Sequence, residues 1–200
     1  MKHKQVVSLI LSMALILTAI FTGCAREEQP KQPLAETSQE PESEGAFSNL
    51  NHFEAETLDG AAFTQDNLLD KDVTVINFWS VTCGPCIAEM PALARLSESL
   101  PDNVQVLTVC LDGGDYQEDA SEILSQAGFQ GTTLLSGDGD FEKVCREIQY
   151  TPTTIFVDKD GNTSSEVIIG GQEDLAESYT DVINSILKSM GKEKISVEKD

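Results

Sequence analysis

Short apolar runs alternate with segments of helical periodicity between residues 50 and 190. Two runs rich in β-branched residues, Val73–Trp79 and Val104–Cys110, show no regular alternation of apolar and polar positions. That pattern is typical of strands buried on both faces of a sheet. Thr153–Val157 predicts a third strand and Thr132–Leu135 a shorter one.

Helices are predicted between these strands, where turn residues and proline mark the helix ends. The predicted ranges are Gly84–Leu100, Tyr116–Ala127 and Phe141–Ile148. A final amphipathic helix is indicated by apolar side chains that recur at helical spacing: Leu175, Tyr179, Val182, Ile183 and Ile186.

Two β-hairpins are predicted, one near each end of this region. The first joins Phe53–Thr57 to Ala61–Phe63 through a turn that contains Gly60. The second joins the strand at 153–157 to Val167–Ile169 through the turn sequence DKDGN. Strands that alternate with helices and close with a hairpin and a helix predict an α/β sandwich with a mixed sheet.

The N-terminal segment does not look like part of this fold. Residues 1–23 combine a basic start with the apolar stretch Val6–Ile20, which is the layout of an export signal. The sequence FTGC resembles a bacterial lipobox, although Phe21 replaces the usual aliphatic residue, and Cys24 would then carry lipid. An uncleaved transmembrane anchor is the alternative. Under both hypotheses everything after Cys24 is exported.

Composition sets the remaining boundaries. Residues 24–48 are rich in Glu, Gln, Pro and Ser and predict a lipidated, disordered, acidic tether. Residues 49–190 are expected to fold, and residues 191–200 to form a frayed tail. The chain has 13 basic and 34 acidic residues, a formal net charge of −21, which disfavours nucleic acid as a partner. Five cysteines are too few for a disulfide scaffold.

The candidate chemistry lies in the sequence FWSVTCGPC, where a predicted strand meets a predicted helix. Cys83 precedes the helix, so unpaired N–H groups and the helix dipole would stabilise its thiolate, the nucleophile of disulfide exchange. Cys86, in the first helical turn, is close enough to attack a mixed disulfide on Cys83. Pro85 suits that turn because the position needs no N–H donor.

Glu89 lies on the same predicted helix stripe as Cys86, Met90 and Leu93. We expect its carboxylate to point inward near Cys86, where burial would raise its pKa and let it accept the thiol proton. An ordinary acid that stabilises the first helical turns fits the spacing equally well. Pro91 is expected to kink the helix and free a carbonyl near the pair.

Three features together resemble the thioredoxin superfamily. They are the WxxxCxxC spacing that starts at Trp79, the proline five residues after Cys86, and the pair Thr151–Pro152. Glu89 resembles the corresponding residue of the membrane-anchored TlpA/ResA-type branch, redoxin-like bacterial lipoproteins that are thiol–disulfide oxidoreductases. The resemblance spans roughly residues 50–188. It implies a thioredoxin-like three-layer sandwich, with a central mixed sheet, flanking helices and an N-terminal β-hairpin extension.

The resemblance also implies catalytic roles. Cys83 would be the attacking thiol and Cys86 the buried resolving thiol. Pro152 would be cis and face the pair. Glu89 would tune the pair, because Asn77 stands where cytosolic thioredoxins carry a buried aspartate.

Substrate contacts are expected from the residues around the pair. These are Thr151, whose backbone would hold a substrate chain, with Trp79, Thr82, Gly84 and Pro85. Trp79 is expected to pack in the core beside the site. Thr82 departs from the family pattern, because a tryptophan usually stands just before the first cysteine. The identity of the substrates therefore stays open.

The predicted function is reduction of disulfides in exported proteins, with no metal or organic cofactor. The chain would act as a monomer, lipid-anchored through Cys24 at the extracytoplasmic face of the bacterial cell membrane. The resemblance implies re-reduction by a CcdA/DsbD-like membrane electron donor. It also implies cytochrome c maturation or support of sulfoxide reductases as candidate roles. The direction of electron flow depends on a redox potential that a sequence does not give.

Several alternatives stay open beside this hypothesis. A non-catalytic binding lipoprotein would have the same fold. A thiol peroxidase of the redoxin type would need Pro and Thr where Ile76 and Ser80 stand. A zinc site would need more ligands, and a purely structural Cys83–Cys86 disulfide would stabilise little because its loop is short. Cys110 and Cys145 are expected to be buried free thiols, or a mutual disulfide, because exported proteins rarely keep free thiols.

Overall fold

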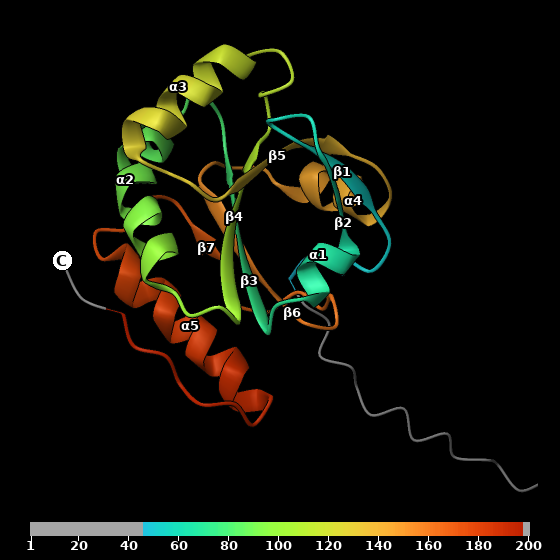
Figure 1. Ribbon diagram of the computed structural model, residues 1–200, viewed down its shortest axis with the longest axis vertical. Coiled ribbons are helices and arrows are strands. Elements are labelled where there is room, and N and C mark those ends of the chain that lie inside the picture. Colours follow the sequence, from blue (N-terminus) through green and yellow to red (C-terminus); the bar gives the residue numbers. More distant parts are fainter. Residues whose placement is uncertain (1–45, 198–200) are drawn as a thin grey trace, which may run out of the picture. The chain divides into compact units, whose positions relative to one another are not determined.

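The computed structural model describes residues 46–197. The predicted export signal, Cys24 and nearly all of the predicted tether lie outside the described residues and stay predictions. In residues 46–197 no helix is long and apolar enough to cross a membrane. This part of the chain is an α/β fold in which helices cover both faces of one sheet (Figure 1).

The described residues form a seven-stranded sheet with the order β2-β1-β5-β4-β3-β6-β7. The strands are β1 (Glu54–Thr57), β2 (Ala62–Thr64), β3 (Val73–Trp79), β4 (Val104–Cys110), β5 (Thr132–Gly137), β6 (Thr153–Asp158) and β7 (Ile168–Ile169). β4 pairs in parallel with both β3 and β5. Every pairing made by β1, β2, β6 or β7 is antiparallel. The mixed sheet predicted from the sequence is confirmed.

Five helices complete the described part of the fold. They are α1 (Gln65–Leu69), α2 (Gly84–Ser99), α3 (Gln117–Ala127), α4 (Gly139–Glu147) and α5 (Leu175–Ser189). α2, α3 and α5 lie on one face of the sheet, and α1 and α4 lie on the other (Figure 1). This arrangement confirms the predicted three-layer sandwich. The predicted N-terminal hairpin is present as β1 and β2, and β1 also pairs with β5.

The strand that leads to the site, β3, is buried along its whole length. Val75 and Trp79 pack in the cluster beneath α2, α3 and α5, whereas Ile76 and Phe78 pack in the cluster on the opposite face. Both faces of the strand therefore need apolar side chains, which explains why its sequence shows no alternation. Each large apolar side chain buried in this way contributes roughly 1.5–3 kcal/mol.

The folded part begins earlier and ends later than composition predicts. The backbone carbonyl of Phe47 accepts a hydrogen bond from Thr163 Oγ1 over 2.5 Å, and Phe47 packs against the core. At the other end, the Asn184 side chain makes two hydrogen bonds, of 2.8 and 3.0 Å, with the backbone of Ile195. The expected tether boundary at 48 and the expected fraying of residues 191–197 are therefore wrong. Phe47 in the first segment, and Ile195 and Val197 in the second, also pack against the core and attach these segments to the domain.

Candidate functional site

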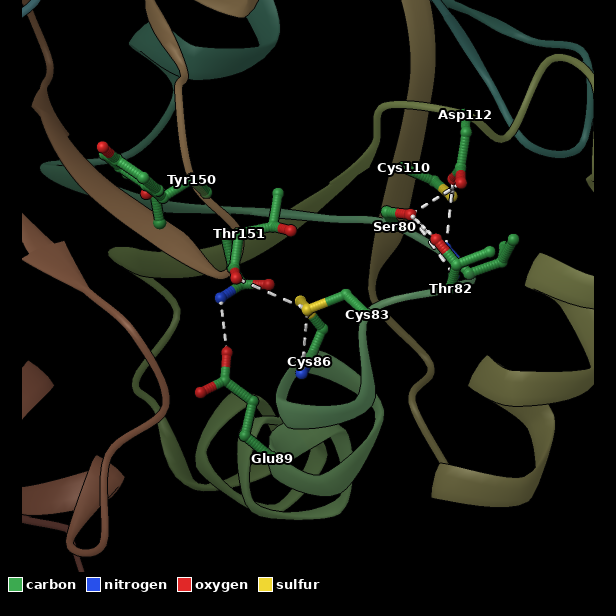
Figure 2. Close-up of a disulfide and its surroundings, with 12 residues drawn as sticks. Ser80, Thr82, Cys83, Cys86, Glu89, Cys110, Asp112, Tyr150 and Thr151 are labelled. Carbon is green, nitrogen blue, oxygen red and sulfur yellow. Dashed lines mark hydrogen bonds between the residues drawn. A yellow bond between two sulfur atoms is a disulfide. The ribbon is translucent and has the colours of Figure 1, made fainter.

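Cys83 and Cys86 lie between the end of β3 and the first turn of α2. They form a disulfide with their Cα atoms 5.3 Å apart (Figure 2). Cys83 is the N-cap of α2, and the Cys86 backbone N–H donates to Cys83 Sγ over 3.3 Å. An N–H donor and the positive end of a helix dipole both stabilise a thiolate. The predicted position of Cys83 at a helix N-terminus is confirmed.

The two sulfurs differ in accessibility. Cys83 is partly exposed, whereas Cys86 is fully buried under α2. Thr82, Gly84 and Pro85 are exposed around Cys83. A substrate disulfide can therefore reach Cys83, whereas the buried Cys86 can react only with Cys83.

The loop before β6 lies against the disulfide. The peptide bond between Thr151 and Pro152 is cis, and the Thr151 carbonyl oxygen lies 3.5 Å from Cys83 Sγ. In the disulfide that sulfur has no proton to donate, but a reduced Cys83 thiol could donate to this oxygen. Pro152 is buried and Thr151 half-buried. Within residues 46–197 no hydrogen-bond acceptor is found for the Thr151 N–H.

Glu89 points inward from α2 and is only 6% exposed. Its Oε1 accepts a hydrogen bond from Asn77 Nδ2 over 2.9 Å. Burial raises the pKa of the Glu89 carboxyl, and the hydrogen bonds from Asn77 and from the backbone near Gln172 offset only part of that rise. The predicted inward position and raised pKa are confirmed. A carboxyl of this kind can take up and release a proton close to a reacting thiol.

A row of buried, hydrogen-bonded side chains connects Glu89 on α2, through Asn77 on β3 and Thr154 on β6, to Tyr179 on α5. Asn77 Nδ2 also donates to Thr154 Oγ1 over 3.0 Å, and Thr154 Oγ1 lies 2.6 Å from the Tyr179 hydroxyl. Burial, followed by the charge of Glu89, raises the pKa of Tyr179. These hydrogen bonds orient the NH₂ group of Asn77 towards Glu89. Sequence reasoning missed Thr154, and it treated Tyr179 only as an apolar position.

Trp79 offers a substrate no exposed surface in the described fold. Its side chain is fully buried beneath the helices, as the last residue of the central strand. Its inclusion among the substrate-contacting residues is therefore wrong, and the expectation that it packs beside the site holds.

Two exposed apolar side chains flank the cis-proline loop and were not singled out from the sequence. Tyr150 is 66% exposed, and Ile169, which pairs with Thr153 across the β6–β7 hairpin, is 61% exposed. The signal that could have identified Tyr150 from the sequence was its position next to Thr151.

On the other side of Cys83 lies a groove of about 270 Å³. It is lined by Val81, Thr82, Tyr116, Asp119, Glu122, Ile123 and Gln126.

Cys110 and Cys145 are free thiols on opposite faces of the sheet. The alternative of a mutual disulfide is therefore contradicted, because the sheet separates the two sulfurs. Burial raises the pKa of each thiol to about 12, and the hydrogen bond from Cys110 to Asp112 adds to the rise at Cys110. Among residues 46–197, no group of three or more His, Cys, Asp or Glu side chains is arranged to hold a metal ion.

A thioredoxin-like fold with a CxxC-spaced disulfide at a helix N-terminus is the architecture of thiol–disulfide oxidoreductases. Residues 38–179 match the Redoxin family, and the chain belongs to that family. It is 28% identical over 110 residues to a thioredoxin-like protein of Haemophilus influenzae, covering 55% of this chain and 63% of that protein. It is 27% identical over 107 residues to the thiol:disulfide interchange protein HelX of Rhodobacter capsulatus, covering 54% and 58%. The matches thus span about three fifths of these relatives.

The fold is also similar to that of dsbF from Mycobacterium tuberculosis, a structure with mixed oxidised and reduced forms. The TM-score is 0.55 and the identity 25%, over 68% of this chain and 96% of that one. The likeness extends over most of the described domain and shows the same thioredoxin-like fold.

Proposed function

We propose that the chain is a thiol–disulfide oxidoreductase that reduces disulfide bonds in exported proteins. The carrying observation is the asymmetry of the pair: Cys83 is accessible at a helix N-terminus, and the buried Cys86 is bonded to it. The name of HelX, a thiol:disulfide interchange protein, supports the same chemistry. A non-catalytic binding protein would have no need of this asymmetry.

The reaction begins from the reduced pair. The Cys83 thiolate attacks one sulfur of a substrate disulfide, a Cys83–substrate bond forms, and the other substrate sulfur leaves as a thiolate that takes up a proton. Cys86 then loses its proton, with Glu89 as the acceptor, and attacks Cys83 Sγ. The Cys83–Cys86 disulfide closes and the second substrate thiolate leaves. That second thiolate takes up the proton held by Glu89. The substrate thus gains two electrons and two protons: the pair supplies both electrons and the Cys86 proton, and solvent supplies the other proton because Cys83 reacts as a thiolate.

The substrate chain would lie along the cis-proline loop. The free N–H of Thr151 and its carbonyl beside Cys83 Sγ offer the backbone pairing of an added strand. Tyr150 and Ile169 give an apolar surface on the same side. On the other side of Cys83, the groove beside Thr82 leaves room for substrate residues next to the cysteine.

The cellular setting rests on the N-terminal sequence. Residues 1–23 have the layout of an export signal and Cys24 the position of a lipid attachment site. The protein would be a monomer anchored at the extracytoplasmic face of the membrane, which keeps the domain near a CcdA/DsbD-like donor that re-reduces the pair. The chemistry above needs no metal or organic cofactor. Maturation of cytochrome c and support of sulfoxide reductases are candidate roles.

The two cysteine variants test this proposal in different ways. Cys83→Ser is expected to abolish reduction of insulin disulfides, because the attacking sulfur is gone. Cys86→Ser is expected to accumulate a mixed disulfide on Cys83, which mass spectrometry of the alkylated protein detects. Cys145→Ser is the matched control and should keep full activity, because its thiol lies on the other face of the sheet. Full activity of Cys83→Ser would overturn the mechanism.

A further inference from the structure

Asp112 lies in the turn after β4, directly beside the turn that carries Cys83. The two turns adjoin because Trp79 and Cys110, the last residues of β3 and β4, are partners in the parallel ladder. The Leu111 N–H continues this contact by donating to the Trp79 carbonyl over 2.9 Å. In Figure 2 the Asp112 carboxylate lies on the other side of Cys83 from Thr151 and Glu89.

The Asp112 carboxylate accepts hydrogen bonds from three groups. Its Oδ2 accepts from Ser80 Oγ over 2.6 Å, and its Oδ1 accepts from the Val81 N–H over 3.1 Å. The Cys110 thiol also donates to Oδ1 over 3.4 Å. Burial acts to raise the pKa of Asp112, but the hydrogen bonds from Ser80, Val81 and Cys110 together lower it below its ordinary value. The group is therefore an ionised acceptor at neutral pH.

These bonds continue to the reactive cysteine. Ser80 Oγ lies 3.0 Å from Thr82 Oγ1 and accepts from the Thr82 N–H over 3.3 Å. The Ser80 carbonyl accepts from the Cys83 N–H over 3.1 Å. The turn from Ser80 to Cys83 is thus hydrogen-bonded to one carboxylate in the turn that follows the neighbouring strand β4. Hydrogen bonds to a charged acceptor are stronger than those to a neutral acceptor.

We propose that Asp112 is a positioning residue for Cys83: it fixes the Ser80–Cys83 turn so that the Cys83 sulfur stays at the N-terminus of α2. The inference rests on the proposed function, in which Cys83 is the attacking thiol. Without the hydrogen bonds to Asp112 the turn is free to move, and the Cys83 sulfur loses its fixed place beside the Cys86 N–H. A thiolate that loses such a donor becomes harder to form.

Charge and position act in opposite directions, which makes the role of Asp112 measurable. Removal of a negative carboxylate near Cys83 would by itself lower the pKa of the Cys83 thiol, because less negative charge opposes the thiolate. Loss of positioning raises that pKa. Ser80→Ala removes the contacts of Ser80 Oγ with Asp112 and Thr82 without any change of charge, so it reports position alone.

The experiment measures alkylation of the reduced full-length chain by iodoacetamide as a function of pH, with the modified cysteine assigned by peptide mass. Asp112→Ala is expected to raise the pKa of Cys83 by roughly half a unit or more, and Ser80→Ala to raise it by less. Asp112→Asn, which keeps one acceptor oxygen, should fall between Asp112→Ala and the unmodified protein. Asp115→Ala is the matched control, because Asp115 is an exposed acid in the same turn.

The outcomes separate this inference from the proposed function. A lowered or unchanged pKa of Cys83 in Asp112→Ala and Ser80→Ala would overturn the positioning role. If Asp112→Ala does not fold, as judged by circular dichroism, the smaller Ser80→Ala change decides alone. If Cys83 in the unmodified protein is no more reactive than Cys86, the proposed function fails instead.

Discussion

Asn77 and Glu89 lie 12 positions apart in sequence, and a buried hydrogen bond of 2.9 Å joins Asn77 Nδ2 to Glu89 Oε1. The bond connects the central strand to the helix of the disulfide. Because Asn77 also donates to Thr154, its NH₂ group is directed at the carboxyl. The site thus has one buried ionisable carboxyl, held by a neutral amide.

Glu89→Gln is expected to stabilise the oxidised protein at pH 7–8. Folding raises the pKa of Glu89, so the native state binds this proton more tightly than the unfolded chain does. Stability is therefore lost as the pH rises through the native pKa of Glu89. Gln removes this loss and keeps an acceptor for Asn77.

Urea unfolding of both proteins between pH 4 and 8 checks this prediction. The variant should be more stable at pH 8, and the two free energies of unfolding should converge as the pH falls towards the ordinary value of 4.5. Glu98→Gln, at an exposed position on the same helix, is the control. A difference between the two free energies of unfolding that stays constant with pH would contradict the prediction, because it would show that burying the ionised Glu89 carboxylate costs no stability.

Asn77→Asp is expected to destabilise the protein by roughly 2 kcal/mol at pH 7.5, because two buried carboxyls cannot both ionise at hydrogen-bond distance. The pKa of the coupled pair rises on folding, so the loss should shrink as the pH falls. Asn162→Asp is the matched control. It places the same change beside Asp158 on an exposed turn, where solvent screens the repulsion. Equal effects of the two substitutions at pH 7.5 would contradict the prediction.

Tyr150→Ser and Ile169→Ser are expected to raise the KM for a protein disulfide roughly tenfold together, because an exposed apolar surface beside the thiol binds substrate chain. The reaction with a small linear disulfide such as oxidised glutathione should stay unchanged. Leu69→Ser removes an exposed apolar side chain from α1, on the opposite face of the sheet from α2, and should change neither reaction. An equal loss of activity with both substrates would contradict this prediction, because it would show that the substitutions impair the Cys83–Cys86 pair and not the binding of the substrate chain.

Cys110 and Cys145 are expected to resist alkylation in the native protein at pH 8. The pKa of each thiol is about 12 because of burial, so almost no thiolate is present to react. Unfolding in guanidinium should make both react fully. Mass mapping of the oxidised protein checks this, and a peptide pair linked through Cys110 and Cys145 would contradict the fold.

Local sequence determined much of the site. The unalternating run of β3, the proline in the first turn of α2 and the stripe that carries Glu89 each follow from neighbours in sequence, and so the positions of Cys83 and Cys86 could be predicted. Helix α1 could not, because its five residues bury only Leu68 and give no periodicity.

Contacts between distant segments account for what the sequence did not reveal. Asp112 meets the turn before Cys83 only because β3 and β4 pair in register, 31 or 32 positions apart in sequence. Thr154 meets Asn77 through the antiparallel pairing of β3 with β6. Trp79 resembled a site residue because it lies close to Cys83 in sequence, but the burial of β3 directs its side chain into the core.

The redox potential of the Cys83–Cys86 pair tests the central claim most directly. The full-length chain is equilibrated in thiol/disulfide buffers, and the fluorescence of its single tryptophan, Trp79, which is buried beside the site, reports the state of the pair. We predict one reversible two-electron transition with a potential more negative than about −200 mV, in the range of disulfide reductants. A potential near about −120 mV, typical of a strong oxidant, or no reversible transition at all, would contradict the proposed reductase.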